Sequence, residues 1–242
     1  MPTFNYRTKD GKRVPGTTTV IGHRKESGGL IHWASAVTKT WVEENLPKLQ
    51  GEALTNETVL GFLGEMEKND YRKARDKAAD AGNLAHEMIE NSLQGEDPSD
   101  VEGPDELFET AWKGYKAYEE WAQGSKLEIV ETETPLVSEQ FRFGGTPDAI
   151  GMVAGQLALL DWKTSNRIYG DYLMQLAAYR HLWEVNHEGK KLHSFHLLRF
   201  GKEFGDFHHH SWPVQVMDIA WEAFRNCRRL YDLDKDLKRA VG

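Results

Sequence analysis

The segment Leu157–Ser165, LALLDWKTS, constrains the fold of this chain more than any other stretch. It begins with four apolar residues in succession, a pattern typical of a strand that passes through a hydrophobic core. The run then ends in Asp161 and Lys163, two opposite charges on either side of a tryptophan. Because side chains alternate along a strand, these charges project from one face, about 6 to 7 Å apart at the backbone. Burying either charge unpaired would cost several kcal/mol, so we expect the strand to surface at this end.

The remaining sequence predicts an α/β (α+β) fold. Helical patterns cover residues 30–46, 55–67, 69–93 and 104–123, and three β-like runs, a helix, two strands and a closing helix follow. This order predicts a mixed central sheet flanked by helices. The segment around Asp10-Gly11 is expected to form a short hairpin or an extended arm. We predict one domain over residues 1–242, with a mostly helical part to residue 125 and a sheet-containing core from residue 126.

Composition narrows the functional classes. With 39% hydrophobic and 28% charged residues, the chain has the composition of an ordinary globular protein. A net charge of -8 argues against a protein that coats nucleic acid through bulk electrostatics, although a local basic groove remains compatible with it. The single cysteine, Cys227, excludes an intrachain disulfide and a four-cysteine iron–sulfur cluster. No signal peptide or membrane span is apparent, so we expect a cytoplasmic protein without membrane association.

A second acid is expected beside the first. The sequence GGTPDAIG places Asp148 at a bend that enters the neighbouring strand. If the two strands turn near residues 154–155, Asp148 and Asp161 lie opposite each other at roughly 5 Å. Two carboxylates at that range repel each other unless a cation lies between them, and such oxygen ligands suit Mg²⁺ or Mn²⁺.

Taken singly, each of these residues has a simpler explanation. Asp148 follows a proline and could serve only to form a turn. Asp161 and Lys163 could form an exposed ion pair at a sheet edge, worth about 0 to 1 kcal/mol. The metal-site hypothesis therefore depends on the residues occurring together.

Two predicted helices carry further candidates. Gln175 and Tyr179 stand at i and i+4 and so share one helix face. Gly82, His86 and Glu90 follow the same spacing on an earlier helix. A glycine in a helix interior costs up to about 1 kcal/mol relative to alanine, which suggests that another part of the chain approaches closely there. A lone helical histidine is more often structural than a ligand.

Together these residues resemble the PD-(D/E)xK nuclease superfamily, and within it the RecB-type exonuclease group of bacterial recombination nucleases and phages. The group's pattern is a helical His, then Gly-x-x-Asp, then Asp-or-Glu-x-Lys, then Gln-x-x-x-Tyr. The matching positions are His86, Gly145 to Asp148, Asp161 to Lys163, and Gln175 to Tyr179. The resemblance covers residues 81–179 and implies a restriction-endonuclease-like core. Unlike some relatives, the chain has neither a four-cysteine cluster motif nor the phosphate-binding loop of an attached helicase.

The resemblance implies a DNA nuclease that hydrolyses phosphodiester bonds and leaves 5′-phosphates. One or two Mg²⁺ or Mn²⁺ ions would be held by His86, Asp148, Asp161 and the backbone carbonyl of Trp162. Lys163 would position the attacking water or stabilise the transition state. Gln175 and Tyr179 would orient the DNA or Lys163, and Glu133 and Glu90 are additional candidate acids.

DNA-contact residues are less sharply indicated. Arg142, Arg167 and Tyr169 are the better candidates, because they lie near the proposed site in sequence. Arg72 and Arg75 are further candidates, although interleaved aspartates make a salt-bridged solvent face at least as good an explanation. The histidine run 208–210 is interpreted as strand surface rather than as part of the site.

Exonuclease activity in phage or bacterial replication, recombination or repair is the leading hypothesis, with DNA and a recombination or replication protein as partners. The alternatives are a non-catalytic DNA-binding or assembly protein on the same fold, an endonuclease of the same superfamily, or a metal-dependent hydrolase of another substrate. The intact set of Asp148, Asp161 and Lys163 argues against the non-catalytic alternative. Oligomeric state and strand polarity are left open.

Overall fold

The chain forms two compact units, residues 1–25 with 82–242, and residues 26–81. The computed structural model describes residues 5–23, 28–51, 53, 55–68, 71–201 and 206–241, and the side chains among these except for 28–34, 67–68 and 71–80. The smaller unit holds three helices and the beginning of a fourth: α2 (Gly28–Asn45), η1 (Leu46–Leu49), α3 (Asn56–Lys68) and α4 (Tyr71–Gln94). Apart from Arg72 and Arg75, every residue discussed below belongs to the larger unit. The single domain expected from the sequence stays a prediction.

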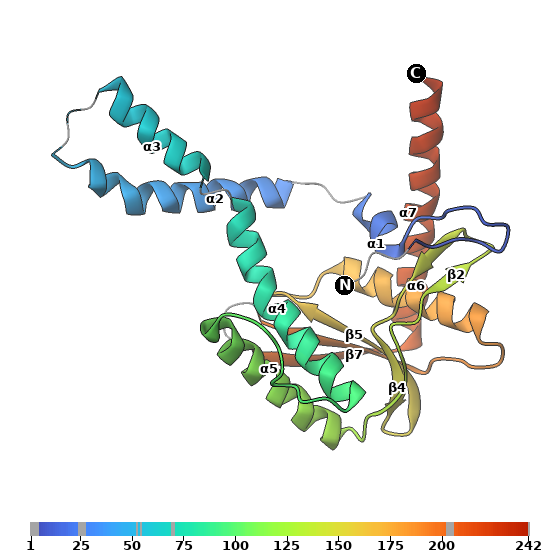
Figure 1. Ribbon diagram of the computed structural model, residues 1–242. Coiled ribbons are helices and arrows are strands. Elements are labelled where there is room, and N and C mark those ends of the chain that lie inside the picture. Colours follow the sequence, from blue (N-terminus) through green and yellow to red (C-terminus); the bar gives the residue numbers. More distant parts are fainter. Residues whose placement is uncertain are drawn as a thin grey trace. The chain divides into compact units, whose positions relative to one another are not determined.

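The larger unit is built on a five-stranded mixed sheet, of which Figure 1 labels β4, β5 and β7. The strand order is β1-β4-β5-β6-β7. β5 and β6 pair in parallel, and the other neighbours pair antiparallel. The strands are β1 (Glu128–Thr132), β4 (Ala149–Val153), β5 (Gln156–Thr164), β6 (Ser194–Phe200) and β7 (Phe207–Trp212). A separate two-stranded sheet, β2 (Leu136–Ser138) with β3 (Phe143–Gly145), is inserted between β1 and β4. The predicted mixed sheet flanked by helices is confirmed.

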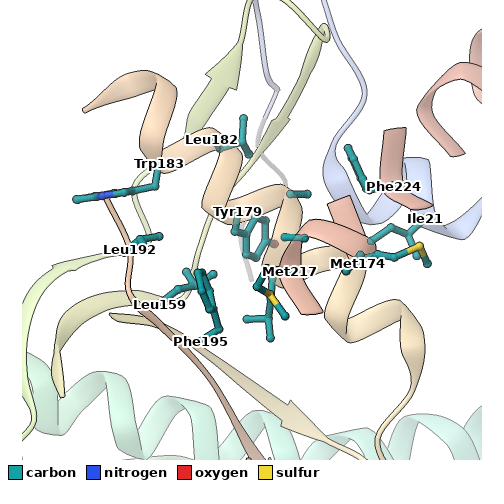
Figure 2. Close-up of a cluster of buried hydrophobic side chains, with 14 of the residues drawn as sticks. Ile21, Leu159, Met174, Tyr179, Leu182, Trp183, Leu192, Phe195, Met217 and Phe224 are labelled. Carbon is teal, nitrogen blue, oxygen red and sulfur yellow. The ribbon is translucent and has the colours of Figure 1, made fainter. Parts of the chain in front are cut away.

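Helices cover both faces of this sheet. The end of α4 and α5 (Asp105–Gly124) pack on one face through a cluster that includes Met88, Tyr115 and Trp162. The opposite face is covered by α1 (Thr17–Gly22), α6 (Gly170–Asn186) and α7 (Val214–Ala240). Figure 2 shows this second cluster, in which Tyr179 lies among apolar side chains of the sheet and of α7. None of the described helices is both long enough and apolar enough to cross a membrane.

β5 is the central strand, and its side chains alternate between the two clusters as expected. Leu159 belongs to the cluster beneath α6, whereas Leu160 and Trp162 belong to the cluster beneath α4 and α5. Asp161 and Lys163 follow Leu159 at the two-residue period and therefore face the α6 side. Residues 158–162 are buried and Leu157 is partly buried, so Asp161 lies within the covered part of the strand. The expectation that the strand surfaces at Asp161 is wrong, because partial exposure begins only at Lys163.

Two glycines allow helices to approach the strands that carry the motif. A Cβ on Gly145 would come within 2.6 Å of both the Thr17 hydroxyl and the Tyr179 ring. A Cβ on Gly82 would overlap the side chain of Thr164 at the end of β5. The sequence predicted that another part of the chain lies close to Gly82, and Thr164 of β5 is that part. This close approach brings α4, and with it His86, against the last residues of β5.

The N-terminal segment departs from the expected arm at one point. A short hairpin forms around Gly11, with Arg7 bridged to Arg13, but residues 17–22 form α1 instead of continuing as an extended arm. The three threonines of this stretch favour extended structure. Burial of Val20 and Ile21 against α6 and α7 outweighs that preference, as tertiary packing commonly does.

Substituting Gly82 tests the packing of α4 against β5. In an open helix position, Gly82→Ala would stabilise the protein by up to about 1 kcal/mol through helix propensity. Here the new methyl group overlaps Thr164, so we expect a net loss of about 1 to 3 kcal/mol in the free energy of unfolding, measured by urea denaturation. Gly124→Ala, where a Cβ meets nothing within 4 Å, is the control and should not destabilise. Equal stability of the two variants would contradict the packing described.

Candidate active site

The β4–β5 hairpin brings together the two aspartates of the motif. Ala149 pairs with Leu160, so the next position in the same register places Asp148 beside Asp161. The hairpin turns at residues 154–155, which both adopt positive φ, as predicted for this connection. Asp148 Oδ2 accepts a hydrogen bond of 2.8 Å from the backbone N–H of Trp162. The two carboxylates are therefore held at one end of the hairpin by backbone pairing rather than by flexible side chains alone.

Lys163 partly neutralises this pair. Its Nζ lies 2.6 Å from Asp161 Oδ2 and donates a hydrogen bond of 3.2 Å to the carbonyl of Trp162. Burial lowers the pKa of Lys163, but the neighbouring carboxylates of Asp161 and Asp148 reverse the shift, and the net direction is upward. Lys163 is thus held in its charged form beside the two acids.

One ammonium group does not balance the two carboxylates. Asp161 has no exposed surface, and burial raises its pKa to about 7, although Lys163 opposes the shift and Asp148 adds to it. Burial also raises the pKa of Asp148, again against the effect of Lys163. Within the described residues, Asp161 Oδ1 is buried without any hydrogen-bond partner. The site therefore lacks positive charge, and an unsatisfied oxygen lies inside it.

His86 reaches the same point from α4. Its ring centroid lies 6.5 Å from that of Trp162, and the imidazole forms a hydrogen bond with the Trp162 backbone. Burial, followed by the charge of Lys163, lowers the pKa of His86 to about 4. The imidazole is consequently neutral at physiological pH, which is the form that can bind a metal ion. A cavity of about 60 Å³ separates this helix from the hairpin and is lined by His86, Glu90, Glu133, Asp148 and Trp162 among others.

Glu133 and Glu90 add to the negative charge around Asp148. The backbone N–H of Glu133 donates to the carbonyl of Asp148 at 3.2 Å, and Glu133 adopts a left-handed φ of 45°. This conformation costs a non-glycine residue about 1 to 3 kcal/mol and is often retained at functional sites. The pKa of Glu90 is raised by burial and then by Glu133 and Asp148. Both predicted additional acids therefore lie close to the aspartate pair.

A cleft of about 830 Å³ on the α6 side is lined by Asp148 and Lys163. Gln175 and Tyr179 line it, and Gln175 Nε2 donates a hydrogen bond of 2.8 Å to the Tyr179 hydroxyl. Burial raises the pKa of Tyr179 well above its usual value, so the hydroxyl stays protonated. The other lining groups around the charges are Tyr6, Arg13, Glu133, Thr146, Asp148, Lys163, Tyr231 and Lys235.

The contributions of the N-terminal segment and of α7 were missed by sequence reasoning. Tyr6 lies across the cleft, with its hydroxyl 2.9 Å from the hydroxyl of Thr146, and Tyr231 and Lys235 approach from α7. These residues are separated from the motif by tens of residues or more and follow no recognisable spacing. The only available signal was the glycine pair before Pro147, since the Tyr6 ring packs where a Cβ of Gly144 would stand.

The predicted DNA-contact residues are distributed around the site rather than within the cleft. The Arg167 guanidinium lies 4.9 Å from the centroid of the half-exposed Tyr169 ring, in the connection between β5 and α6. Arg142 lies in the β2–β3 turn and lines neighbouring hollows. Arg72 and Arg75 are on α4, where the side chains fall outside those described.

The histidine run keeps to the β7 surface as expected. His209 faces His196 at 2.8 Å, whereas His208 and His210 lie on the other side of the strand with ring centroids 6.3 Å apart. None of the three lines the cleft described above.

The donor set at the end of the hairpin suits a hard divalent cation. Asp148 and Asp161 lie side by side next to the backbone carbonyl of Trp162, and the neutral imidazole of His86 approaches this carbonyl from α4. Oxygen ligands of this kind favour Mg²⁺ or Mn²⁺. Asp161 Oδ1 is buried without a hydrogen-bond partner, which fits an oxygen atom that binds a metal ion. In the described part of the chain, no three His, Cys, Asp or Glu side chains form a ready-made metal site, so the carbonyl and water would have to complete the coordination.

Comparison with known proteins gives structural neighbours only. No family model and no curated protein matches the sequence. Among solved structures, the chain is similar to a candidate exonuclease of Eubacterium rectale, with 15% identity over 60% of this chain and 64% of that chain and a TM-score of 0.43. It is also similar to the alkaline exonuclease LHK-Exo of Laribacter hongkongensis, with 11% identity over 87% of this chain and 98% of that chain and a TM-score of 0.33.

The same exonuclease solved in complex with dAMP matches at 12% identity over 68% of this chain and 90% of that chain, with a TM-score of 0.37. The chain thus covers about two-thirds of the Eubacterium rectale neighbour. Similarity at these levels carries no argument about activity, so function has to be argued from the site itself.

Proposed function

We propose that this protein is a divalent-metal-dependent nuclease that hydrolyses phosphodiester bonds in DNA. One observation carries the proposal: the carboxylates of Asp148 and Asp161 and the ammonium group of Lys163 come together at the end of the β4–β5 hairpin, where Asp148 and Lys163 line a cleft and Asp161 lies buried behind them. A structural ion pair would need one acid for one base. The second carboxylate and the unsatisfied Asp161 oxygen are costly for folding, and a bound cation explains why they are present.

Each residue has a part that its surroundings support. Asp148, Asp161, the Trp162 carbonyl and His86 would hold one or two Mg²⁺ or Mn²⁺ ions. When bound, such an ion lowers the pKa of a water ligand and neutralises charge on phosphate oxygens. Lys163 would stabilise the negative charge that grows on the scissile phosphate, since its ammonium group lies beside the carboxylates and borders the cleft.

Gln175 and Tyr179 would orient the substrate. Their mutual hydrogen bond fixes both side chains on the cleft wall, and the protonated Tyr179 hydroxyl can donate to a phosphate or sugar oxygen. Glu133 and Glu90 would tune the charge around the ions or hold water. Arg167 and Tyr169 would contact the strand near the site, because their cation–π pair offers a surface for base stacking.

We infer an exonuclease mode, 5′-phosphate products, and a role in phage or bacterial DNA replication, recombination or repair from the motif resemblance. The cytoplasm of a bacterium or of a phage-infected cell would be the place of action. An endonuclease with the same site is the second candidate, because its chemistry requires the same residues.

Incubation with DNA of different forms tests the proposal. We expect linear DNA to be degraded with Mg²⁺ or Mn²⁺ and left intact with EDTA, because the carboxylates act through a cation. Covalently closed circular DNA should resist if the enzyme needs an end. Cleavage of the closed circle would favour the endonuclease alternative, and no cleavage of any form under any metal would overturn the nuclease proposal.

Metal binding has a readout that does not depend on activity. A ligand that binds only the folded state at 100 times its Kd raises the free energy of unfolding by about 2.7 kcal/mol. We therefore expect Mn²⁺ to raise the Tm of the wild type and to have little effect on Asp161→Asn. Asp105→Asn, at the exposed start of α5, is the control and should keep the full shift. An undiminished shift in Asp161→Asn would remove this residue from the ligand set.

Lys163→Ala separates chemistry from metal binding. We expect cleavage to fall by roughly 10² to 10³, the range seen when one transition-state donor is removed, while Mn²⁺ still raises the Tm. Lys116→Ala, an exposed lysine on α5, should leave both measurements unchanged. Wild-type turnover in Lys163→Ala would refute the role assigned to the ammonium group.

A further inference from the structure

A basic groove continues from the cleft along α7. It has a volume of about 320 Å³, and its cations are Arg13, Arg142, Arg228, Arg229, Lys235 and Arg239. They come from the N-terminal hairpin, from the β2–β3 turn and from α7, which lies beside α1 in the larger unit (Figure 1). Arg13 and Lys235 also line the catalytic cleft, so the two hollows are continuous.

The groove is positively charged although the chain as a whole is acidic. Its walls contain six cations and two carboxylates, whereas the complete sequence has a net charge of -8. Both carboxylates are already paired: Asp232 lies 2.5 Å from Arg228, and Asp236 lies 3.3 Å from Arg239. A third carboxylate, Asp10, lies 3.6 Å from Arg142, so the excess positive charge rests on the other cations of the groove.

Arg142 is held in place by a buried partner. Arg228, of which 8% is exposed, donates hydrogen bonds of 3.2 Å and 3.0 Å from Nε and Nη2 to the Arg142 carbonyl. Arg142 has a left-handed φ of 52°, which a non-glycine residue adopts at a cost of about 1 to 3 kcal/mol. Arg228 thus acts as a positioning residue, because it fixes a strained turn whose arginine side chain lines the groove.

Three cations in the groove are available to a ligand. Arg13, Arg229 and Lys235 are exposed, and none of them forms an ion pair with another described residue. The Lys235 ammonium lies 4.3 Å from the centroid of the Tyr231 ring. A phosphate placed here would gain charge-assisted contacts without having to displace an existing carboxylate.

We propose that this groove binds the phosphate backbone of the nucleic-acid strand whose scissile phosphate lies in the cleft. The inference rests on the proposed nuclease function and assigns the path of its substrate. A polymer with regularly spaced phosphates can occupy a groove and a cleft that are continuous, whereas a flat anionic membrane contacts a surface and not the bottom of a groove. The residues contact phosphates and not base edges, so binding is independent of sequence.

Salt-dependent binding without catalysis tests the groove. The variant is Arg229→Ala/Lys235→Ala, and the probe is a short fluorescein-labelled oligonucleotide, single-stranded or duplex, followed by anisotropy in EDTA. Each lost phosphate contact reduces the slope of log K against log salt by about 0.9 for duplex and about 0.7 for single strands. Because the double variant removes two contacts, we expect it to lower the slope by roughly 1.8 with duplex DNA and by roughly 1.4 with single-stranded DNA.

Lys190→Ala/Lys191→Ala removes two charges from an exposed loop outside the groove and should leave the slope unchanged. A selective loss in the groove variant supports the proposal even if the protein never cleaves DNA, in which case the nuclease function alone fails. An unchanged slope in the groove variant overturns the proposal even if the wild type is an active nuclease. Binding of the wild type to phosphatidylserine vesicles but not to oligonucleotide would also overturn it.

Discussion

The antiparallel register between β4 and β5 is the constraint on which the candidate site depends. It places Asp148 beside Asp161, and a shift of one residue would turn one of these carboxylates to the opposite face of the sheet. The turn at residues 154–155 and the apolar pattern of β5 together fix this register. Parallel pairing with β6 then holds β5 in the centre of the sheet, where it cannot slide.

Burial explains why the charges occur only at the end of this strand. Both faces of β5 are covered, one by α6 and α7 and the other by α4 and α5, so a polar side chain in its middle would have no solvent and no room for a ligand. The cleft is reached only at the end of the strand, where Lys163 lines it. Gly145 and Gly82 bring the covering helices close on both sides, which keeps His86 and Tyr179 within reach of the hairpin.

The sequence was informative where the structure is local. The β4–β5 hairpin, the alternation along β5 and the helix of Gln175 and Tyr179 all follow from periodicity and turn residues over short distances. The contributions of Tyr6 and Lys235 could not be predicted, because these residues reach the cleft only through tertiary packing. In the sequence, Tyr6 lies more than a hundred residues before Asp148, and Lys235 lies about seventy residues after Lys163. α1 was missed for the related reason that its threonines have extended preferences, which burial of Val20 and Ile21 overrides.

The cleft walls differ in how much of the chain must be folded before they exist. The carboxylate pair needs only a hairpin whose strands are adjacent in sequence, which forms with little loss of loop entropy. The opposite wall joins the N-terminal hairpin to α7, and its closure must wait until most of the larger unit has been assembled. Complete formation of the cleft is therefore limited by these long-range contacts and not by the hairpin that carries the aspartates.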